Sequence, residues 1–278
     1  MTMPSEFNRL SGFLEAIRSH TSFKPKVALV LGSGLGGFVD ELDIIDAVNY
    51  RDIKDFPVST APGHVGRFVF VNIKGVPTVI MQGRIHYYEG YAMRDVVAPI
   101  RLLKMLGAEI LFLTNAAGSV DLSYKVGDFM IIKDHISCLL PSPLRGENIA
   151  ELGSRFSDMT TVYDLDLQKI IADVAAKHQI SCKTGVYLQT AGPNFETATE
   201  VAMYRLWGAS AVGMSTACEA MAANHMNMKI CGISCISNLG AGIGNNPLTE
   251  EEVAETTTRI ADQFKMLIEK TIEQMGAL

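Results

Sequence analysis

Short apolar runs alternate with amphipathic and polar segments along most of the chain. Residues 5–20 place Phe7, Leu10, Phe13, Leu14 and Ile17 on one stripe, which predicts an amphipathic helix. Runs rich in β-branched and aromatic residues predict buried strands at 26–31, 66–75, 76–81, 109–114, 128–132, 185–189, 210–213 and 229–236. Further helices are expected at 93–106 and 163–178, from about residue 198, up to residue 224, and after a capping threonine at position 249.

This pattern predicts one α/β domain that spans residues 1–278, with a mixed, twisted β-sheet flanked by α-helices. The segment 139–160 is rich in Pro, Gly and Ser, and strands with core-like sequences lie on both sides of it. We therefore expect a long irregular loop there and not a linker between domains.

The first predicted strand runs directly into a glycine-rich turn. Gly32, Gly34 and Gly37 match the G-x-G-x-x-G spacing of dinucleotide-binding proteins. The acidic residue expected further along is missing, because Asp52 and Asp55 fall in a polar connection instead of at a strand end. Any tight turn that offers backbone N–H groups to an anion has the same glycines, so the turn favours phosphate binding over a whole dinucleotide.

Composition and charge argue against several classes of function. The chain has 278 residues, 48% of them hydrophobic, and its formal net charge is −6 with scattered Lys and Arg, which argues against nucleic-acid binding. The first ten residues lack a signal-peptide pattern, and no apolar run is long enough to cross a bilayer. The five cysteines form no CxxC pair, and Cys231 and Cys235 lie in an apolar strand. We expect a cytoplasmic protein with free thiols, without a metal and without a cofactor.

Several predicted strands end in residues that suit an anion. Ser33 offers a hydroxyl among backbone N–H groups, Arg84 offers a bidentate guanidinium, and His86 follows two residues later. Ala116 lies in a turn of small residues that allows backbone N–H groups to approach a ligand. Each residue alone is more often structural, whereas the set together indicates a site.

Two other strand ends suit a purine. The segment Thr190-Ala-Gly-Pro-Asn-Phe-Glu-Thr197 presents Phe195 for stacking and Glu196 for hydrogen bonding just after a strand. Ionised Glu196 only accepts hydrogen bonds, which fits the N1–H of a 6-oxopurine and disfavours adenine unless the carboxylate is protonated. Asn238 can donate and accept, and so can address O6 and N7. The alternatives are a solvated loop for Glu196 and a local Asx turn for Asn238.

These motifs together resemble the trimeric purine nucleoside phosphorylases over nearly the whole chain. The matching segments are 31–36, 62–66, 82–90, 114–118, 191–197, 213–216 and 237–238. The resemblance implies reversible phosphorolysis of 6-oxopurine (2′-deoxy)ribonucleosides to the free base and (deoxy)ribose 1-phosphate, with inorganic phosphate as co-substrate.

The resemblance also assigns roles to individual residues. It implies that Asn238, Glu196 and His86 are catalytic. Phosphate would be held by Ser33, Arg84, His86, Ala116 and Ser215, with His64 nearby. The ribose would be contacted by Tyr88 and Met214, and the base by Phe195, Glu196 and Asn238, with Tyr187 close by. Phe156, in the long loop, would reach the site of a neighbouring subunit in a homotrimer.

The sequence departs from the family pattern at two positions. Glu250 stands where many members have a histidine that bonds the ribose 5′-hydroxyl, so that contact is open. Asn224 stands where relatives often have arginine. The sequence also leaves open the preference among inosine, guanosine and xanthosine, the sugar tolerance, and whether loop 239–247 closes on the substrate.

Three other functions remain to be compared. A methylthioadenosine phosphorylase would have Asp in place of Asn238. An NAD-dependent oxidoreductase rests on Gly32, Gly34 and Gly37 alone. A purine-binding module without activity would have no need of the anion site formed by Arg84 and His86.

Overall fold

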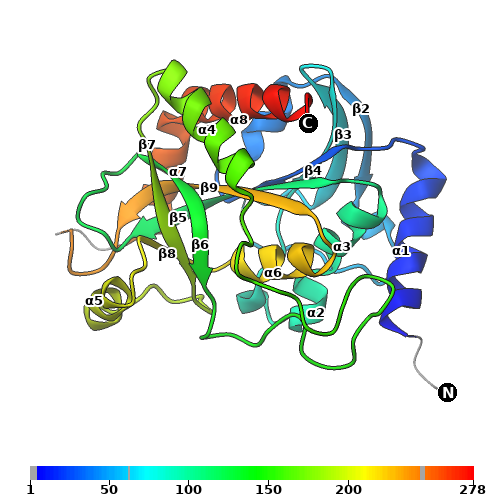
Figure 1. The fold of residues 1–278 in the computed structure, drawn as a ribbon, viewed down its shortest axis with the longest axis horizontal. Coiled ribbons are helices and arrows are strands. Elements are labelled where there is room, and N and C mark those ends of the chain that lie inside the picture. Colours follow the sequence, from blue (N-terminus) through cyan, green and yellow to red (C-terminus); the bar gives the residue numbers. More distant parts are fainter. Residues whose placement is uncertain (1–4, 62, 245–247) are drawn as a thin grey trace.

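The computed structural model describes residues 5–61, 63–244 and 248–278, and its centre is a nine-stranded sheet (Figure 1). The strand order is β2-β3-β4-β1-β5-β8-β7-β6-β9, and β5 also pairs with β9, so that the last five strands close on themselves. The strands are β1 (Val27–Leu31), β2 (Ile44–Asn49), β3 (Arg67–Ile73), β4 (Val76–Gln82), β5 (Ile110–Ser119), β6 (Phe129–Ile136), β7 (Cys182–Gln189), β8 (Ala211–Gly213) and β9 (Lys229–Leu239).

The sheet contains both parallel and antiparallel pairs, which confirms the mixed sheet predicted from the sequence. β1 is parallel to β4 and to β5, and β5 is parallel to β9. The carboxyl ends of these four strands therefore lie at one edge, where ligands of open α/β sheets bind. β2, β3 and β4 form an antiparallel meander on the outer side.

Helices cover both faces of the sheet (Figure 1). α4 and α8 pack together on one face, whereas α3 contacts α1 and α6 on the other. The helices are α1 (Glu6–His20), α2 (Met93–Val96), α3 (Ala98–Met105), α4 (Leu165–Lys177), α5 (Ala198–Leu206), α6 (Ala217–His225), α7 (Glu250–Arg259) and α8 (Ala261–Met275).

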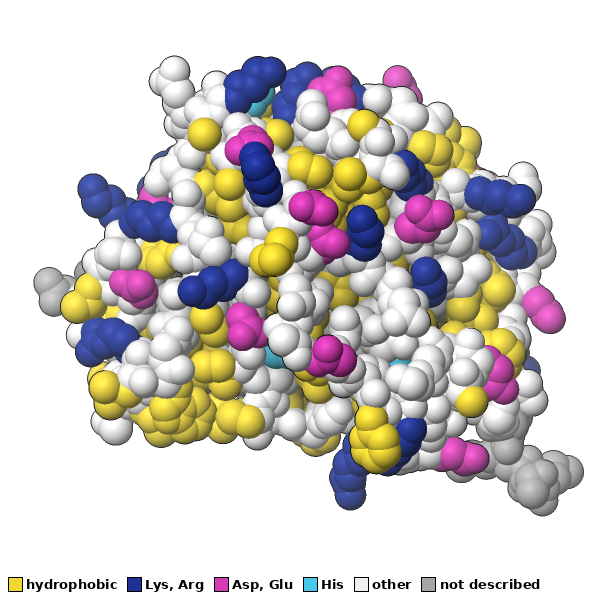
Figure 2. Space-filling view, in the orientation of Figure 1, with side chains coloured by type: hydrophobic (Ala, Val, Ile, Leu, Met, Phe, Trp, Pro, Cys, Tyr) yellow, Lys and Arg dark blue, Asp and Glu magenta, His cyan; other side chains and the backbone are white. Residues whose placement is uncertain are grey.

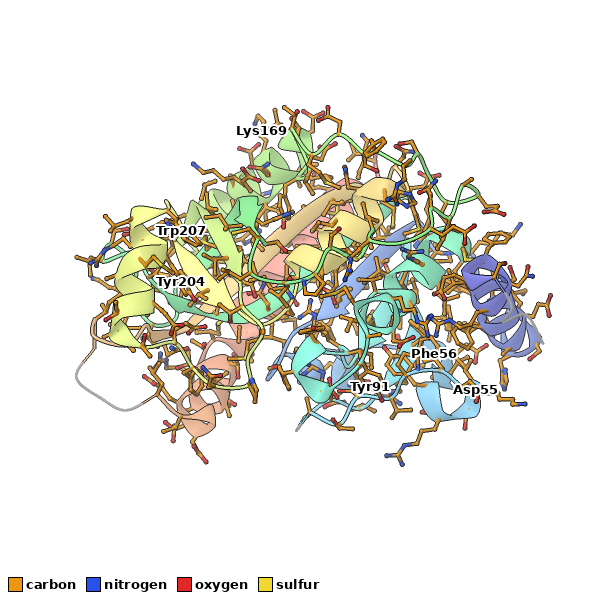
Figure 3. The ribbon with its side chains drawn as sticks, turned by 90° about the horizontal axis from the view of Figure 1, so that it is seen from below. Asp55, Phe56, Tyr91, Lys169, Tyr204 and Trp207 are labelled. Atoms are coloured by element: carbon orange, nitrogen blue, oxygen red, sulfur yellow. The ribbon has the colours of Figure 1, made fainter. Side chains whose placement is uncertain are left out.

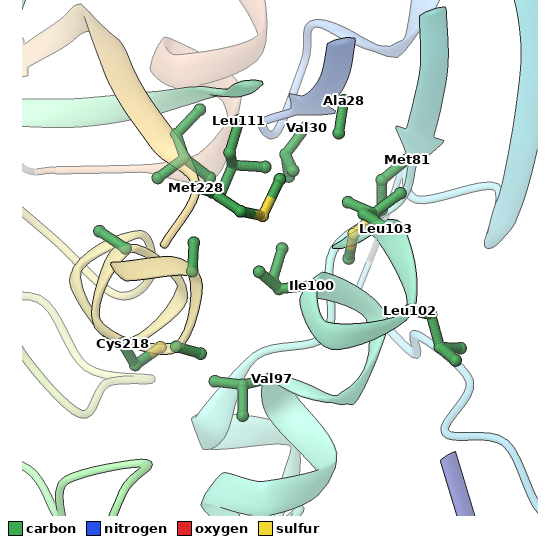
Figure 4. Packing of buried hydrophobic residues seen from close by; sticks show 14 of the residues in the cluster. Ala28, Val30, Met81, Val97, Ile100, Leu102, Leu103, Leu111, Cys218 and Met228 are labelled. Carbon is green, nitrogen blue, oxygen red and sulfur yellow. The ribbon is translucent and has the colours of Figure 1, made fainter. Parts of the chain in front are cut away.

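Apolar side chains fill most of the core between α3 and the sheet. Figure 4 shows Ile100 and Val97 between the sheet residues Val30 and Leu111 on one side and α6 on the other. The α1 stripe contributes Leu10, Phe13 and Ile17 to the same core, as its periodicity predicts.

Several elements differ from the sequence prediction for identifiable reasons. The predicted helix at 93–106 is divided at Val97, just before Pro99, which occupies the first turn of α3 and cannot continue a preceding helix. The C-terminal helix is likewise divided at Ile260. β2 was not predicted, because it is an edge strand with mostly exposed residues and thus lacks an apolar run. β5 and β9 extend through the polar residues that follow their apolar runs, because those residues pair with each other, with one register shift between Ala117 and Gly118.

Candidate active site

A pocket of about 330 Å³ lies where β1, β4, β5, β7, β8 and β9 end, or in the segments that follow them. Ten of the thirteen predicted site residues line it: Ser33, Arg84, His86, Tyr88, Ala116, Phe195, Glu196, Met214, Ser215 and Asn238. Gly118, Pro193 and Ser237 complete part of the wall. The sheet topology thus brings predicted site residues up to 205 positions apart in the sequence, Ser33 and Asn238, into one pocket.

An ion pair beneath this pocket holds its anion end together. Arg84 Nε and Nη2 donate to the two carboxylate oxygens of Glu219, at 2.8 and 2.9 Å, and Nη1 donates to the Thr114 carbonyl at 2.9 Å. Both side chains of the pair are 1% exposed. Burial opposes the positive charge, but the Glu219 carboxylate outweighs it and raises the pKa of Arg84.

The guanidinium keeps donors for a ligand after these bonds are made. Arginine carries five N–H groups in a fixed plane, and Glu219 and Thr114 use three of them. The remaining two belong to Nη1 and Nη2, and Arg84 lines the pocket. Glu219 was missed from the sequence, although one charged residue in the otherwise apolar start of α6 was a usable signal.

His64 orients the hydroxyl of Ser33. Its Nδ1 accepts the backbone N–H of Arg84 at 2.7 Å, and its Nε2 lies 3.1 Å from Ser33 Oγ. Burial, with the charges of His86 and Arg84, lowers the pKa of His64 to about 3, so the ring is neutral. Because Nδ1 accepts, the single proton resides on Nε2 and is donated to Ser33 Oγ. The proton of the Ser33 hydroxyl is then available to an anion in the pocket.

His86 lines the same pocket as Arg84 and Tyr88. Its ring stacks on Tyr88 with centroids 4.7 Å apart, and its Nδ1 lies 3.2 Å from Glu89 Oε1. Glu89 Oε1 also accepts the backbone N–H of His86 at 2.7 Å. Burial lowers the pKa of His86, so the contact with Glu89 fixes the orientation of a ring that is largely neutral near pH 7.

At the other end, Glu196 and Asn238 present hydrogen-bonding groups beside an aromatic ring. Glu196 Oε1 accepts from the Thr190 hydroxyl at 3.0 Å, and burial raises the pKa of its carboxyl group. Asn238 Oδ1 accepts from Ser237 Oγ at 2.8 Å. A Cβ on Gly118 would lie 3.0 Å from Asn238 Nδ2, so glycine is required there for the amide to adopt this position.

Three predicted residues do not line the pocket. Tyr187 is fully buried beneath it, and its hydroxyl accepts the Ser215 backbone N–H at 3.4 Å, so it supports a residue of the wall. His64 acts through Ser33, as described above. Phe156 is 89% exposed in the long loop, outside the pocket of its own chain.

The two departures from the family pattern have different outcomes. Asn224 Nδ2 donates to the Asp158 carbonyl at 2.8 Å, which ties the long loop to the end of α6 close to Phe156. Glu250 begins α7, but its side chain lies outside the described residues, as do residues 245–247 of the predicted closing loop.

Two further features limit the chemistry of the site. Among the residues that the structure describes, no group of three or more His, Cys, Asp or Glu is placed to hold a metal ion. The glycine turn at 32–37 leads into a short 3-10 helix, Gly36–Glu41, so it lacks the α-helix N-terminus that holds a dinucleotide pyrophosphate.

We predict that Glu219→Ala lowers the free energy of unfolding by about 3–5 kcal/mol, because it leaves the Arg84 charge buried without its partner. The measurement is urea denaturation, with Glu255→Ala on the exposed face of α7 as the matched control. The double variant Arg84→Met/Glu219→Leu is expected to recover most of the loss. A change below about 1 kcal/mol for Glu219→Ala would show that the pair is not a structural constraint.

Comparison with known proteins identifies the family. Residues 26–273 match the model of the phosphorylase superfamily. The chain is 43% identical over 272 residues to purine nucleoside phosphorylase 1 of Bacillus subtilis, covering 98% of this chain and 99% of that protein. A Schistosoma purine nucleoside phosphorylase solved in complex with hypoxanthine has a TM-score of 0.90 at 34% identity, covering 96% of this chain and 97% of that one. The chain therefore belongs to the purine nucleoside phosphorylases within the phosphorylase superfamily.

Proposed function

We propose that this pocket catalyses the reversible phosphorolysis of 6-oxopurine (2′-deoxy)ribonucleosides to the free base and (deoxy)ribose 1-phosphate, as an enzyme of purine salvage. The observation that carries the proposal is the combination of an anion end and a purine end in one pocket. A base-binding module would need only Phe195, Glu196 and Asn238. The neighbouring donors of Arg84 and Ser33 are needed only when an anion reacts beside the base.

The anion end is suited to phosphate as a nucleophile. The free N–H groups of Arg84 and the hydroxyls of Ser33 and Ser215 supply charge and hydrogen bonds, and Ala116 supplies backbone. Phosphate held there lies next to the sugar region formed by Tyr88 and Met214. Cleavage of the N9–C1′ bond develops oxocarbenium-like charge on the sugar, which the adjacent phosphate anion stabilises.

The purine end stabilises the leaving group. In the proposed complex Phe195 packs on the purine ring, ionised Glu196 accepts the N1–H, and Asn238 bonds O6 and N7. As the glycosidic bond breaks, negative charge develops on the purine. The hydrogen bond that the Asn238 amide donates to the purine becomes stronger as a result. His86, fixed against Tyr88 and Glu89, stands at the junction of sugar and phosphate. Neither a cofactor nor a metal ion takes part in these steps.

Asn238 also favours this substrate class over methylthioadenosine. Adenine presents an acceptor at N1, to which ionised Glu196 cannot donate, and an amino group at C6, which would suit an aspartate in place of Asn238. The pocket therefore favours inosine and guanosine.

We expect hypoxanthine and guanine to be released from inosine and guanosine only when inorganic phosphate is present, while adenosine is cleaved far more slowly. Reversed-phase chromatography of reactions with and without phosphate measures each base directly. Base release that is equally fast without phosphate would make the protein a hydrolase and would remove the role of the anion end. Absence of cleavage under all conditions would leave a binding function.

The preference for 6-oxopurines is expected to depend on pH through Glu196. Burial raises the pKa of this carboxyl group, so it takes up a proton at a higher pH than an exposed glutamate does. The protonated group can donate to adenine N1, whereas the ionised group accepts from the N1–H of a 6-oxopurine. The ratio of kcat/KM for inosine to that for adenosine should therefore fall as the pH is lowered through the Glu196 pKa.

The control for this pH dependence is Glu196→Gln, which removes the titrating group and leaves His64 and His86 in place. The ratio should become nearly independent of pH in this variant. A wild-type ratio that is already constant with pH would show that Glu196 does not select the base.

We further propose that the active form is a cytoplasmic homotrimer in which Phe156 completes the site of a neighbouring subunit. Phe156 is 89% exposed on a loop tethered to α6, so its ring is accessible to a neighbouring subunit. Leu206 at the end of α5 is also 87% exposed, and Figure 2 shows hydrophobic side chains gathered over that end of the molecule. All five cysteines are free thiols, which fits a reducing compartment, and no helix in the described part of the chain could cross a membrane.

Mixing two impaired variants tests the shared site. Homo-oligomers of Phe156→Ala lack the phenylalanine at every site, and those of Asn238→Ala lack the amide at every site. When they are dissociated and reassembled together, some sites combine a native Asn238 with a neighbour's Phe156. Activity above the sum of the separate variants is expected, and activity equal to that sum would contradict the proposal.

A further inference from the structure

A second and larger cavity lies on the other side of the molecule from α5. Its volume is about 840 Å³, and it is bounded by α1, α3, the segment 53–55 and the loop at 143–149. Figure 3 shows Asp55, which lines this cavity, next to α1 and far from Tyr204 and Trp207. The cavity shares no lining residue with the strand-end pocket, so the proposed reaction does not use it.

Arg101 is the unexplained residue of this cavity. It lies on α3, is only 4% exposed, and lines the cavity. Its Nε and Nη1 have no hydrogen-bond partner among the described residues, and its Nη2 has a single weak contact of 3.5 Å with the Pro143 carbonyl. Arg84, which is equally buried, has three good hydrogen bonds and a carboxylate partner.

A buried guanidinium without a counter-charge is unfavourable. Charged groups removed from water are normally paired or hydrogen-bonded, because the lost hydration costs several kcal/mol. Burial accordingly lowers the pKa of Arg101 from its usual value, and the nearby charge of Arg9 lowers it further, against the opposing effect of Glu6. An anion in the cavity would supply the missing partner.

The charges around the cavity favour an anion. The lining carries five basic side chains, namely Arg9, Lys54, Arg94, Arg101 and Arg145, against three acidic ones, Glu6, Asp55 and Glu147. Glu6 is already occupied, because both of its carboxylate oxygens accept from Arg9 at 2.9 and 2.6 Å. Arg9 also bonds Asp95 at 2.7 Å, so Arg9 is neutralised while Arg101 is not.

We propose that this cavity binds a phosphate-class anion, either inorganic phosphate or a phosphate ester, with the buried guanidinium of Arg101 as its anchor. The guanidinium of arginine donates to phosphate oxygens, and the Nε and Nη1 of Arg101 make no hydrogen bond to the described residues, so each keeps an unused donor for an anion. The cavity is within the size range of small-molecule sites and is wide enough for an ester whose organic part packs on Phe13 and Ile53.

Equilibrium dialysis of the full chain against radiolabelled inorganic phosphate tests this site by counting bound phosphates. The wild-type chain is expected to bind two per chain, one in each cavity, and Arg101→Met one. The control Arg205→Met removes an exposed arginine elsewhere and should leave the count at two. The same count for Arg101→Met as for the wild type would overturn the proposal.

Two further measurements keep the outcome decisive. If Arg101→Met does not fold, Arg84→Met/Glu219→Leu removes the guanidinium of the strand-end pocket instead and should retain one phosphate at Arg101; no bound phosphate would overturn the proposal. If the proposed function is wrong and the strand-end pocket does not bind phosphate, the wild type binds one phosphate, at Arg101, and Arg101→Met binds none. A changed sedimentation coefficient for Arg101→Met with an unchanged phosphate count would mean that another copy of the chain fills the cavity, which also contradicts the proposal.

Phosphate esters are distinguished from inorganic phosphate by competition. An ester ligand displaces labelled phosphate from Arg84→Met/Glu219→Leu at lower concentration than unlabelled phosphate does. Equal or weaker displacement by ribose 5-phosphate and nucleoside monophosphates would identify inorganic phosphate as the ligand.

Discussion

The buried ion pair between Arg84 and Glu219 is the constraint on which the anion end of the site depends. It joins the segment after β4 to α6, and the bond from Arg84 to Thr114 adds the centre of β5. The Glu219 carboxylate offsets the cost of burying the Arg84 charge, which would amount to several kcal/mol without a partner. The pair therefore fixes the plane of a guanidinium that lines the pocket and keeps two unused N–H groups.

Other polar groups of the pocket are also held in place by hydrogen bonds to neighbouring residues. His64 accepts from the backbone of Arg84 and donates to Ser33, so the position of one strand end determines the hydroxyl orientation at another. Tyr187 supports Ser215, and Ser237 supports Asn238. Most of the groups that would face a substrate are thus oriented before it arrives, which is the condition for electrostatic stabilisation of a transition state. Glu196 differs, because burial raises its pKa and makes its charge sensitive to pH.

Much of the fold and of the site could be predicted because each of the central strands combines an apolar run with polar residues directly after it. The apolar runs of β1, β4, β5 and β9 identify the buried strands, and parallel pairing brings the polar residues after them to one edge. Ser33, Arg84, Ala116 and Asn238 follow from that rule, whereas Phe156 and Met214 came from the family resemblance alone.

What could not be predicted depends on contacts between distant segments. Glu219 is identified as a partner of Arg84 only when α6 is placed beside the segment that follows β4, and Tyr187 is identified as a support of Ser215 only when β7 is placed beneath the pocket. Edge strand β2 has too few buried residues to give a pattern. Arg101 looks like any helical arginine in the sequence, and its missing partner is a property of three-dimensional packing.

The most direct test of the central claim is to follow inosine cleavage in phosphate buffer by ³¹P NMR together with hypoxanthine release. Phosphorolysis predicts that the inorganic phosphate signal decreases while a sugar 1-phosphate signal grows in equal amount to the hypoxanthine. Release of hypoxanthine with free ribose and an unchanged phosphate signal would contradict the account, because the anion end of the pocket would then have no part in the reaction.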